Sequence, residues 1–139
     1  MRFPSDEWWA ALVDAINASP AYAEAAADWE GAVSLVIEAE PDKGVPDTLW
    51  GHLDLWHGTC RSGAFVRPEE GETAPYVVRA PYSRWKAVIR RELDPIKGMM
   101  QGKLKVTGDL ATLVRQVKAA AELVNVVGTV ATEFVDEEE

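Results

Sequence analysis

The residues best suited to catalysis lie in the stretch GHLDLWHG, which contains His52, Asp54 and His57. A histidine beside a carboxylate can act as a general base, and two histidines can hold a metal ion. His52 and Asp54 share one face of a strand, but residues five apart point to opposite faces, so the two histidines do not meet. We interpret the three as surface neighbours and keep a His52–Asp54 base as an alternative.

Two other stretches resemble reactive motifs but lack a part that the chemistry needs. Cys60 has no base beside it in the sequence pattern that would activate its thiol. The stretch GMMQGKLK is similar to a phosphate-binding loop, but Gly98 and Gly102 stand one residue too close and Leu104 replaces the magnesium-binding Ser or Thr. No His, Cys or carboxylate cluster has metal-ligand spacing. The sequence therefore predicts no enzyme, no metal site and no cofactor.

Length and composition indicate one folded domain over residues 1–139. The chain is 47% hydrophobic, which allows a real core, and its apolar runs are too short to cross a bilayer. With one cysteine an internal disulfide is impossible, and no export signal is apparent at the N-terminus, so we expect a cytoplasmic protein.

The charge of the chain is unevenly distributed. A net charge of −9 argues against general nucleic-acid binding, yet residues 79–105 carry eight basic and two acidic side chains. This segment is interpreted either as a solvated helix surface or as an anion site. Residues 136–139, DEEE, are expected to be a frayed acidic tail.

Apolar periodicity predicts an α+β order of elements. Two helices, after Ser5 and over about 21–28, precede four strands near 29–40, 48–57, 59–67 and 76–80. A helix over 83–93, a short helical turn to 102, a strand over 103–107 and a long helix after Asp109 follow. The long helix is expected to bury one stripe, consisting of Leu110, Leu113, Val114, Val117, Ala121 and Val124. We expect the helices on one face of a largely antiparallel meander, and residues 129–135 remain unassigned.

The segment LDPIKGMMQGKLKVTGDLATLVRQV, residues 93–117, resembles the sterol-carrier-protein type (sterol carrier protein 2-like) lipid-transfer domain. That family has a helix-breaking Pro, a pair of large apolar residues, Gln-Gly-Lys-Leu-Lys, and Thr-Gly or Ser-Gly before a long helix. Pro95, the Met99–Met100 pair, residues 101–105 and residues 107–108 occupy these places in order. The resemblance covers about residues 29–124.

The resemblance implies a five-stranded, mainly antiparallel sheet with helices packed on one face and a hydrophobic tunnel between the two layers. It implies non-catalytic binding and transport of one fatty acid, acyl-CoA or sterol-like lipid, with transient membrane contact. The expected tunnel residues are Trp85, Val88, Ile89, Leu93, Met99, Met100, Val106, Leu113, Val117 and Val124. Arg84, Arg90 and Arg91 are the expected partners of an anionic head group.

Two other functions stay open at this point. One is an accessory module that forms a homodimer through surface tryptophans, because exposed aromatic patches mark interfaces. The tryptophans concerned are Trp8, Trp9, Trp29, Trp50 and Trp56. The other is a small enzyme that acts on an apolar substrate in the same cavity.

Overall fold

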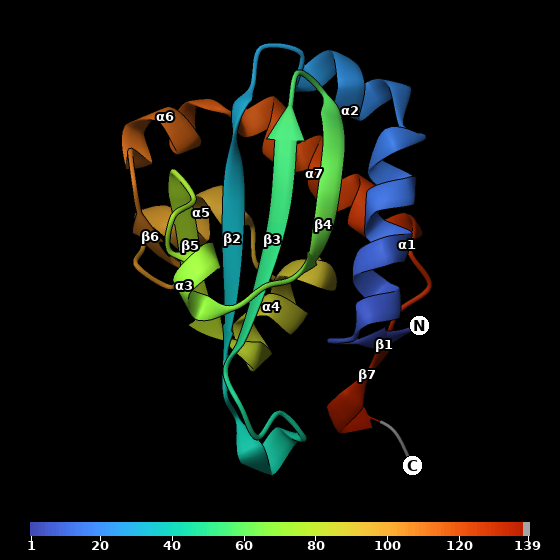
Figure 1. Cartoon of the computed structure of the whole chain (residues 1–139), viewed down its shortest axis with the longest axis vertical. Coiled ribbons are helices and arrows are strands. Elements are labelled where there is room, and N and C mark those ends of the chain that lie inside the picture. The colour runs from blue at the N-terminus through green and yellow to red at the C-terminus, as the bar shows by residue number, and fades with distance from the viewer. Residues whose placement is uncertain (138–139) are drawn as a thin grey trace.

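The computed structural model describes residues 1–137, which form a mixed α+β fold (Figure 1). The elements in chain order are β1 (Arg2–Phe3), α1 (Asp6–Asn17), α2 (Pro20–Ala25), β2 (Glu30–Glu38), the 3-10 turn η1 (Pro41–Lys43), β3 (Leu49–Trp56), β4 (Thr59–Phe65), α3 (Pro68–Gly71), β5 (Tyr76–Pro81), α4 (Tyr82–Ile89), α5 (Pro95–Met100), β6 (Lys105–Thr107), α6 (Leu110–Arg115), α7 (Val117–Thr129), β7 (Glu133–Phe134) and the 3-10 turn η2 (Val135–Glu137).

The main sheet has five strands in the order β4-β3-β2-β5-β6. Three of its four pairings are antiparallel, and β2 and β5 run parallel. The predicted mainly antiparallel α+β class is therefore confirmed. The expected meander breaks at β5, which pairs with the free edge of β2 and not with the free edge of β4, the preceding strand.

The longer helices cover one face of this sheet, with α7 crossing behind the strands in the view of Figure 1. Helix α1 begins as its sequence predicts, because the Ser5 hydroxyl accepts a hydrogen bond from the Trp8 amide at 3.2 Å. Its apolar residues recur at helical spacing, so Trp8, Trp9, Leu12 and Ile16 are buried on one side. The main core lies between these helices and the sheet.

The opposite face of the sheet is covered by the single turn of α3 (Figure 1). Ser34, fully buried on β2, donates from its hydroxyl to the Gly71 carbonyl of α3 at 2.8 Å. Val36, Trp50 and Val77 form a small second apolar cluster on this side. The turn therefore satisfies a buried hydroxyl as well as covering apolar side chains.

The long last helix of the sequence prediction is two helices. Gln116 adopts φ −90° and ψ 44°, which ends α6 and changes the direction of the apolar stripe before α7 begins. The predicted continuous stripe is wrong for this reason. Leu113 is buried, whereas Leu110 is 40% and Val117 is 55% exposed.

The C-terminal residues are tied to the fold up to Glu137. Strand β7 pairs in parallel with β1, and Asp136 accepts hydrogen bonds from Tyr82 and Lys86 of α4. The expectation of a frayed tail is wrong for Asp136 and Glu137, because both are held by basic side chains of α4 or its end. Positions 138 and 139 lie outside the described residues.

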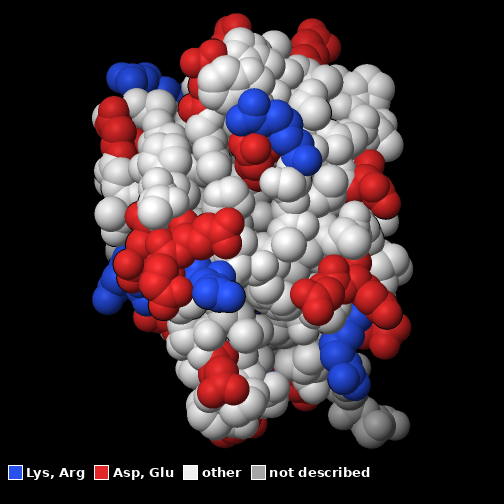
Figure 2. Space-filling model, viewed as in Figure 1, with Lys and Arg blue, Asp and Glu red and all other residues white. Residues whose placement is uncertain are grey.

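Most of the tryptophans that the sequence placed on the surface are in the interior. Of the five concerned, Trp8, Trp9, Trp29 and Trp50 are all below 10% exposed, and Trp56 is 40% exposed. The surface seen in Figure 2 carries interspersed acidic and basic side chains with uncharged areas between them. The aromatic patch on which the dimer interpretation rested is therefore not present at the surface.

Candidate ligand-binding cavity

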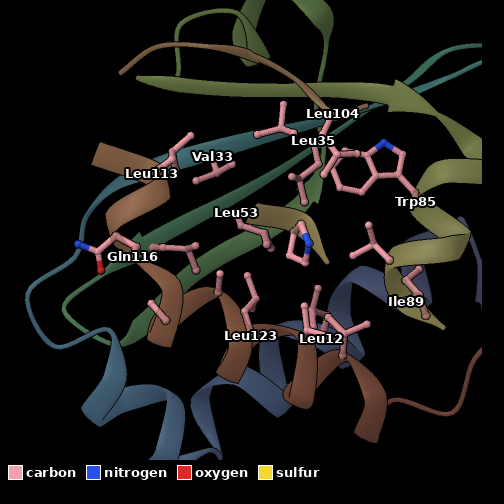
Figure 3. A pocket seen from close by; sticks show the side chains of 18 of the residues that line it. Leu12, Val33, Leu35, Leu53, Trp85, Ile89, Leu104, Leu113, Gln116 and Leu123 are labelled. Carbon is pink, nitrogen blue, oxygen red and sulfur yellow. The ribbon is translucent and has the colours of Figure 1, made fainter. Parts of the chain in front are cut away.

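A cavity of about 180 Å³ lies between the sheet and the helices, and we call it the inner cavity (Figure 3). The sheet contributes Val33, Leu35, Leu53, Leu55 and Val78. The helical side contributes residues from α1, α2, α4, α5, α6 and α7, among them Leu12, Trp85, Ile89, Leu113 and Leu123. Figure 3 shows Leu113 and Gln116 at one end and Trp85 and Ile89 at the other. The cavity thus runs along the interface of the two layers.

The lining of the inner cavity is almost entirely apolar. Gln116 and Tyr22 are its polar side chains apart from the indole nitrogens, and no Asp, Glu, Lys, Arg or His within residues 1–137 lines it. Burial raises the pKa of Tyr22 to about 12, so its phenol is neutral at physiological pH. A lining of this kind favours hydrocarbon and disfavours an ion.

An outer groove of about 230 Å³ adjoins the inner cavity between α5 and α7. The two spaces share Pro95, Ile96, Ala120 and Val124, so these residues separate the interior from the surface. The rim of the groove carries the polar side chains of Arg91, Asp94 and Asn125. The Asp94 carboxylate is already used, because it accepts from the Lys97 amide at 3.0 Å as the N-cap of α5.

Arg91 occupies an unusual backbone position at the rim. Its φ is 63°, in the left-handed region just after α4. Its guanidinium lies against Gly128 of α7, where an added Cβ would be 2.9 Å from one of its nitrogens. A glycine at 128 thus lets a cationic side chain cross from the end of α4 to α7.

The ten apolar residues that were predicted to line the tunnel lie in different parts of the structure. Six of them border the inner cavity: Trp85, Val88, Ile89, Met99, Leu113 and Val124. Leu93 and Val117 border the outer groove instead. Val106 on β6 packs against the core outside both spaces. Met100 is 70% exposed, so the methionine pair is split between the interior and the surface.

The three arginines expected near the ligand also lie in different places. Arg84 is exposed on α4 and borders neither space. Arg90 pairs with Glu137 at 3.0 Å and with Glu92 at 3.4 Å. Arg91 alone of the three borders the outer groove.

Two of the three catalytic candidates of the sequence, Asp54 and His57, are engaged in ordinary pairs. Asp54 accepts two hydrogen bonds from Arg61, each at 3.0 Å, and His57 Nε2 lies 2.6 Å from Glu30. Burial raises the pKa of the Cys60 thiol to about 11, which keeps it protonated and unreactive at neutral pH. Within residues 1–137 no group of His, Cys, Asp and Glu is placed to hold a metal ion.

Comparison with known proteins agrees with this geometry. The model of the SCP-2 sterol transfer family matches residues 12–122. The chain belongs to this family. Membership implies binding or transfer of an apolar lipid, as the resemblance predicted. The comparison with curated proteins found no match.

Two solved structures of sterol carrier type share the family fold closely. One is a crystal structure of sterol carrier protein 2, with 37% identity, a TM-score of 0.82, and coverage of 91% of this chain and 98% of that chain. The other is a conserved hypothetical protein from Thermus thermophilus, described as a candidate sterol carrier protein. It has 37% identity, a TM-score of 0.82, and coverage of 93% of this chain and 90% of that chain.

The fold also occurs inside larger enzymes. A stereoselective inverting sec-alkylsulfatase from Pseudomonas sp. matches 91% of this chain with 16% of its own length, at 16% identity and a TM-score of 0.54. At that identity the likeness concerns the fold alone.

Among the described residues of the present chain, no helix is both long and apolar enough to span a membrane.

Sequence reasoning missed the N-terminal wall of the inner cavity. Phe3, Trp8, Trp9, Leu12 and Tyr22 all border it, although the family resemblance was traced only from residue 29. The signal was present in the sequence, because the apolar residues of α1 recur at helical spacing and therefore had to face a core.

Proposed function

We propose that this protein binds one single-chain amphiphile, with its alkyl chain in the inner cavity and its charged head at the outer groove, and carries it without chemical change. The observation that supports this is the inner cavity itself, which combines an apolar lining with a polar rim on one side. A buried space lined by hydrocarbon and adjoining one cationic group matches the two ends of a fatty acid.

The size of the inner cavity favours a chain over a fused ring system. An engineered apolar cavity of about 150 Å³ binds benzene, so a space of 180 Å³ holds a chain segment somewhat larger than that ring. Burial of about six methylenes contributes roughly 5 kcal/mol before ordering costs. The rest of a longer chain would lie in the outer groove, between α5 and α7.

Arg91 is the proposed head-group partner. It borders the outer groove, and a guanidinium can bind a carboxylate or phosphate through two parallel hydrogen bonds. Arg90 is less suited because Glu137 and Glu92 already neutralise it, and Arg84 lies outside the groove.

A first experiment asks whether the purified protein carries a ligand and how long its chain is. Native mass spectrometry and solvent extraction would identify a bound molecule, and titration with saturated fatty acids of increasing length would follow. We expect affinity to rise with each methylene until the chain fills the inner cavity. A protein that is empty and binds none of these acids would contradict the proposal.

A second experiment tests the head group with a matched pair of variants. Arg91→Gln should weaken fatty-acid binding about tenfold and reduce its salt dependence, because a charge-assisted hydrogen bond is lost. Arg84→Gln removes the same charge from an exposed site on α4 and should leave affinity within twofold. Equal effects of the two substitutions would argue for a general electrostatic attraction and against a bound head group at Arg91.

A further inference from the structure

The backbone of Arg91 adopts a conformation that usually belongs to glycine. Helix α4 ends at Ile89, Arg90 is its C-cap, and Arg91 follows with a φ of 63°. The end of a helix often needs this left-handed angle, but glycine is favoured there because a side chain crowds the backbone. Of residues 1–137, His57 is the other non-glycine residue in this region, and it lies in the tight turn between β3 and β4. An arginine at position 91 is therefore unfavourable for the backbone.

Gly128 departs from local preference in the other direction. It lies inside α7, which continues to Thr129, and its φ is outside the left-handed region. The position is exposed, so no packed core requires a small residue there. Alanine is favoured over glycine in a helix, because glycine loses more backbone freedom on folding. The backbone of α7 thus has no need of a glycine at this position.

These two departures meet at one contact beside the outer groove. The three atoms nearest to a Cβ added at Gly128 would all belong to Arg91, the first of them a guanidinium nitrogen at 2.9 Å. Gly128 follows Asn125 by three residues and Val124 by four, so the three share one side of α7. Asn125 and Val124 border the outer groove, as Arg91 does. The methyl group that position 128 lacks would therefore occupy the place of the guanidinium.

The guanidinium of Arg91 gains no protein partner in this place. It makes no hydrogen bond or ion pair within the part of the chain that the structure describes. The acidic residues next to it are engaged elsewhere, because Glu92 pairs with Arg90 at 3.4 Å and Asp94 accepts from the Lys97 amide. Two choices that are unfavourable for the backbone thus meet without an ion pair to offset them. Such a combination is typical of a functional position.

We propose that Gly128 is a positioning residue, which lets the Arg91 guanidinium lie against α7 and so fixes it for the charged head of the ligand. This inference rests on the proposed function, because it concerns the same head-group site. A carboxylate can accept two parallel hydrogen bonds from a guanidinium, and a donor that is ordered before binding loses less entropy when the ligand arrives. Gly128 then determines how strongly the protein prefers an acid to an uncharged lipid of the same chain.

The test measures head-group specificity with dodecanoic acid and dodecanol at neutral pH. The unaltered protein should bind the acid about tenfold more tightly than the alcohol, because its charge-assisted hydrogen bonds are the stronger ones. In Gly128→Ala the added methyl group meets the flexible end of Arg91 and no backbone atom, so the chain should fold and bind the alcohol as before. Its preference for the acid should fall below threefold.

A double variant shows whether Gly128 acts through Arg91. Arg91→Gln should remove the preference for the acid, and the addition of Gly128→Ala to Arg91→Gln should change the ratio of the two affinities no further. Independent losses from the two substitutions would contradict a positioning role for Gly128.

Thermal stability gives a second readout that a merely structural contact would move in the opposite direction. Arg91→Gly relieves the crowded backbone, and Gly128→Ala adds a residue favoured in helices, so each should raise Tm by a few degrees. Each should also reduce the preference for the acid. A lower Tm with an unchanged preference, in either variant, would show that the contact serves the fold and would overturn the inference.

The outcomes for the inference and for the proposed function are distinct. If Gly128→Ala keeps the full preference for the acid while Arg91→Gln loses it, the inference is wrong and the head-group site stands. If both variants keep the preference, Arg91 is not the head-group partner, and the inference falls with that assignment. If neither dodecanoic acid nor dodecanol binds the unaltered protein, the proposed function itself is wrong.

Discussion

Gly51 on β3 is the residue that makes room for the Trp9 ring, so its replacement tests how tightly this wall is packed. A Cβ there would be 2.2 Å from Trp9 Cζ2, and neither the strand nor the buried ring can move freely. We expect Gly51→Ala to lower the free energy of unfolding by about 3 kcal/mol, measured by urea denaturation.

Gly102 supplies the control for an added methyl group that meets nothing. Its surroundings are open within 4 Å, but its φ is +73°, so Gly102→Ala should lose about 1 kcal/mol from backbone strain alone. Equal losses at the two glycines would show that the Trp9 ring can move away from Gly51.

Asp136 is expected to give the protein a pH-dependent part of its stability. Burial raises the pKa of Asp136, but hydrogen bonds from Tyr82 at 2.6 Å and Lys86 at 3.0 Å lower it, and the net result is a pKa below the ordinary value. Because the pKa is lower in the folded state, this contribution is complete above the unfolded pKa, about 4, and is lost as pH falls through the folded pKa.

Asp136→Asn should therefore lower the free energy of unfolding by about 1–2 kcal/mol at neutral pH. The difference from the unaltered protein should shrink below about pH 4 and be lost as pH falls through the lowered pKa of Asp136 in the folded state, where this carboxyl itself becomes neutral. Glu69→Gln removes an acidic charge from the exposed surface of α3 and should have little effect at either pH. A constant difference between Asp136→Asn and the unaltered protein across this range would contradict the role assigned to the Asp136 charge.

At the scale of elements, the break at Gln116 decides which face of α6 is buried. Leu110 and Leu113 belong to the same helix, yet Leu113 is 8% and Leu110 is 40% exposed. Leu113→Ala should lower the free energy of unfolding by about 2–4 kcal/mol, and Leu110→Ala by less than about 1 kcal/mol. Thermal or urea unfolding of the two variants measures this directly. Similar losses would mean that α6 and α7 form one continuous amphipathic helix after all.

Helices and strands whose apolar residues recur at regular spacing could be predicted from the sequence. Elements whose position depends on contacts with residues far away in the chain could not. The apolar spacing of α1 and the caps at Ser5 and Asp109 are local signals, and the structure confirms them. The turn of α3 and the return of β5 to β2 depend on long-range partners such as Ser34, which local periodicity does not reveal. The bend at Gln116 likewise has no Pro or Gly to mark it.

At the scale of the whole molecule, only part of the lining of the candidate site could be predicted from the sequence. The motif around Met99 led to one wall, formed by α4, α5 and α6, because the family resemblance is concentrated there. Another part of the helical wall comes from α1 and includes Trp9, more than a hundred residues from α7 in the chain. Only the folded arrangement shows that Trp9 lines the inner cavity and that Arg91 borders the outer groove beside it.

The inner cavity lies within the main core, so ligand binding and global stability must be linked. A ligand that binds the folded state alone adds RT ln(1 + [L]/Kd) to the free energy of unfolding, about 2.7 kcal/mol when its concentration is a hundred times Kd. For a chain of 139 residues this should raise Tm by roughly 5 to 10 °C, measured by differential scanning calorimetry. Leu113→Ala enlarges the cavity and should favour a longer chain, whereas Leu110→Ala should not. If a ligand at a hundred times its Kd did not raise Tm, it would have to bind the folded and the unfolded chain equally well. A binding site inside the core exists only in the folded chain, so this result would contradict the assignment of the ligand to the inner cavity.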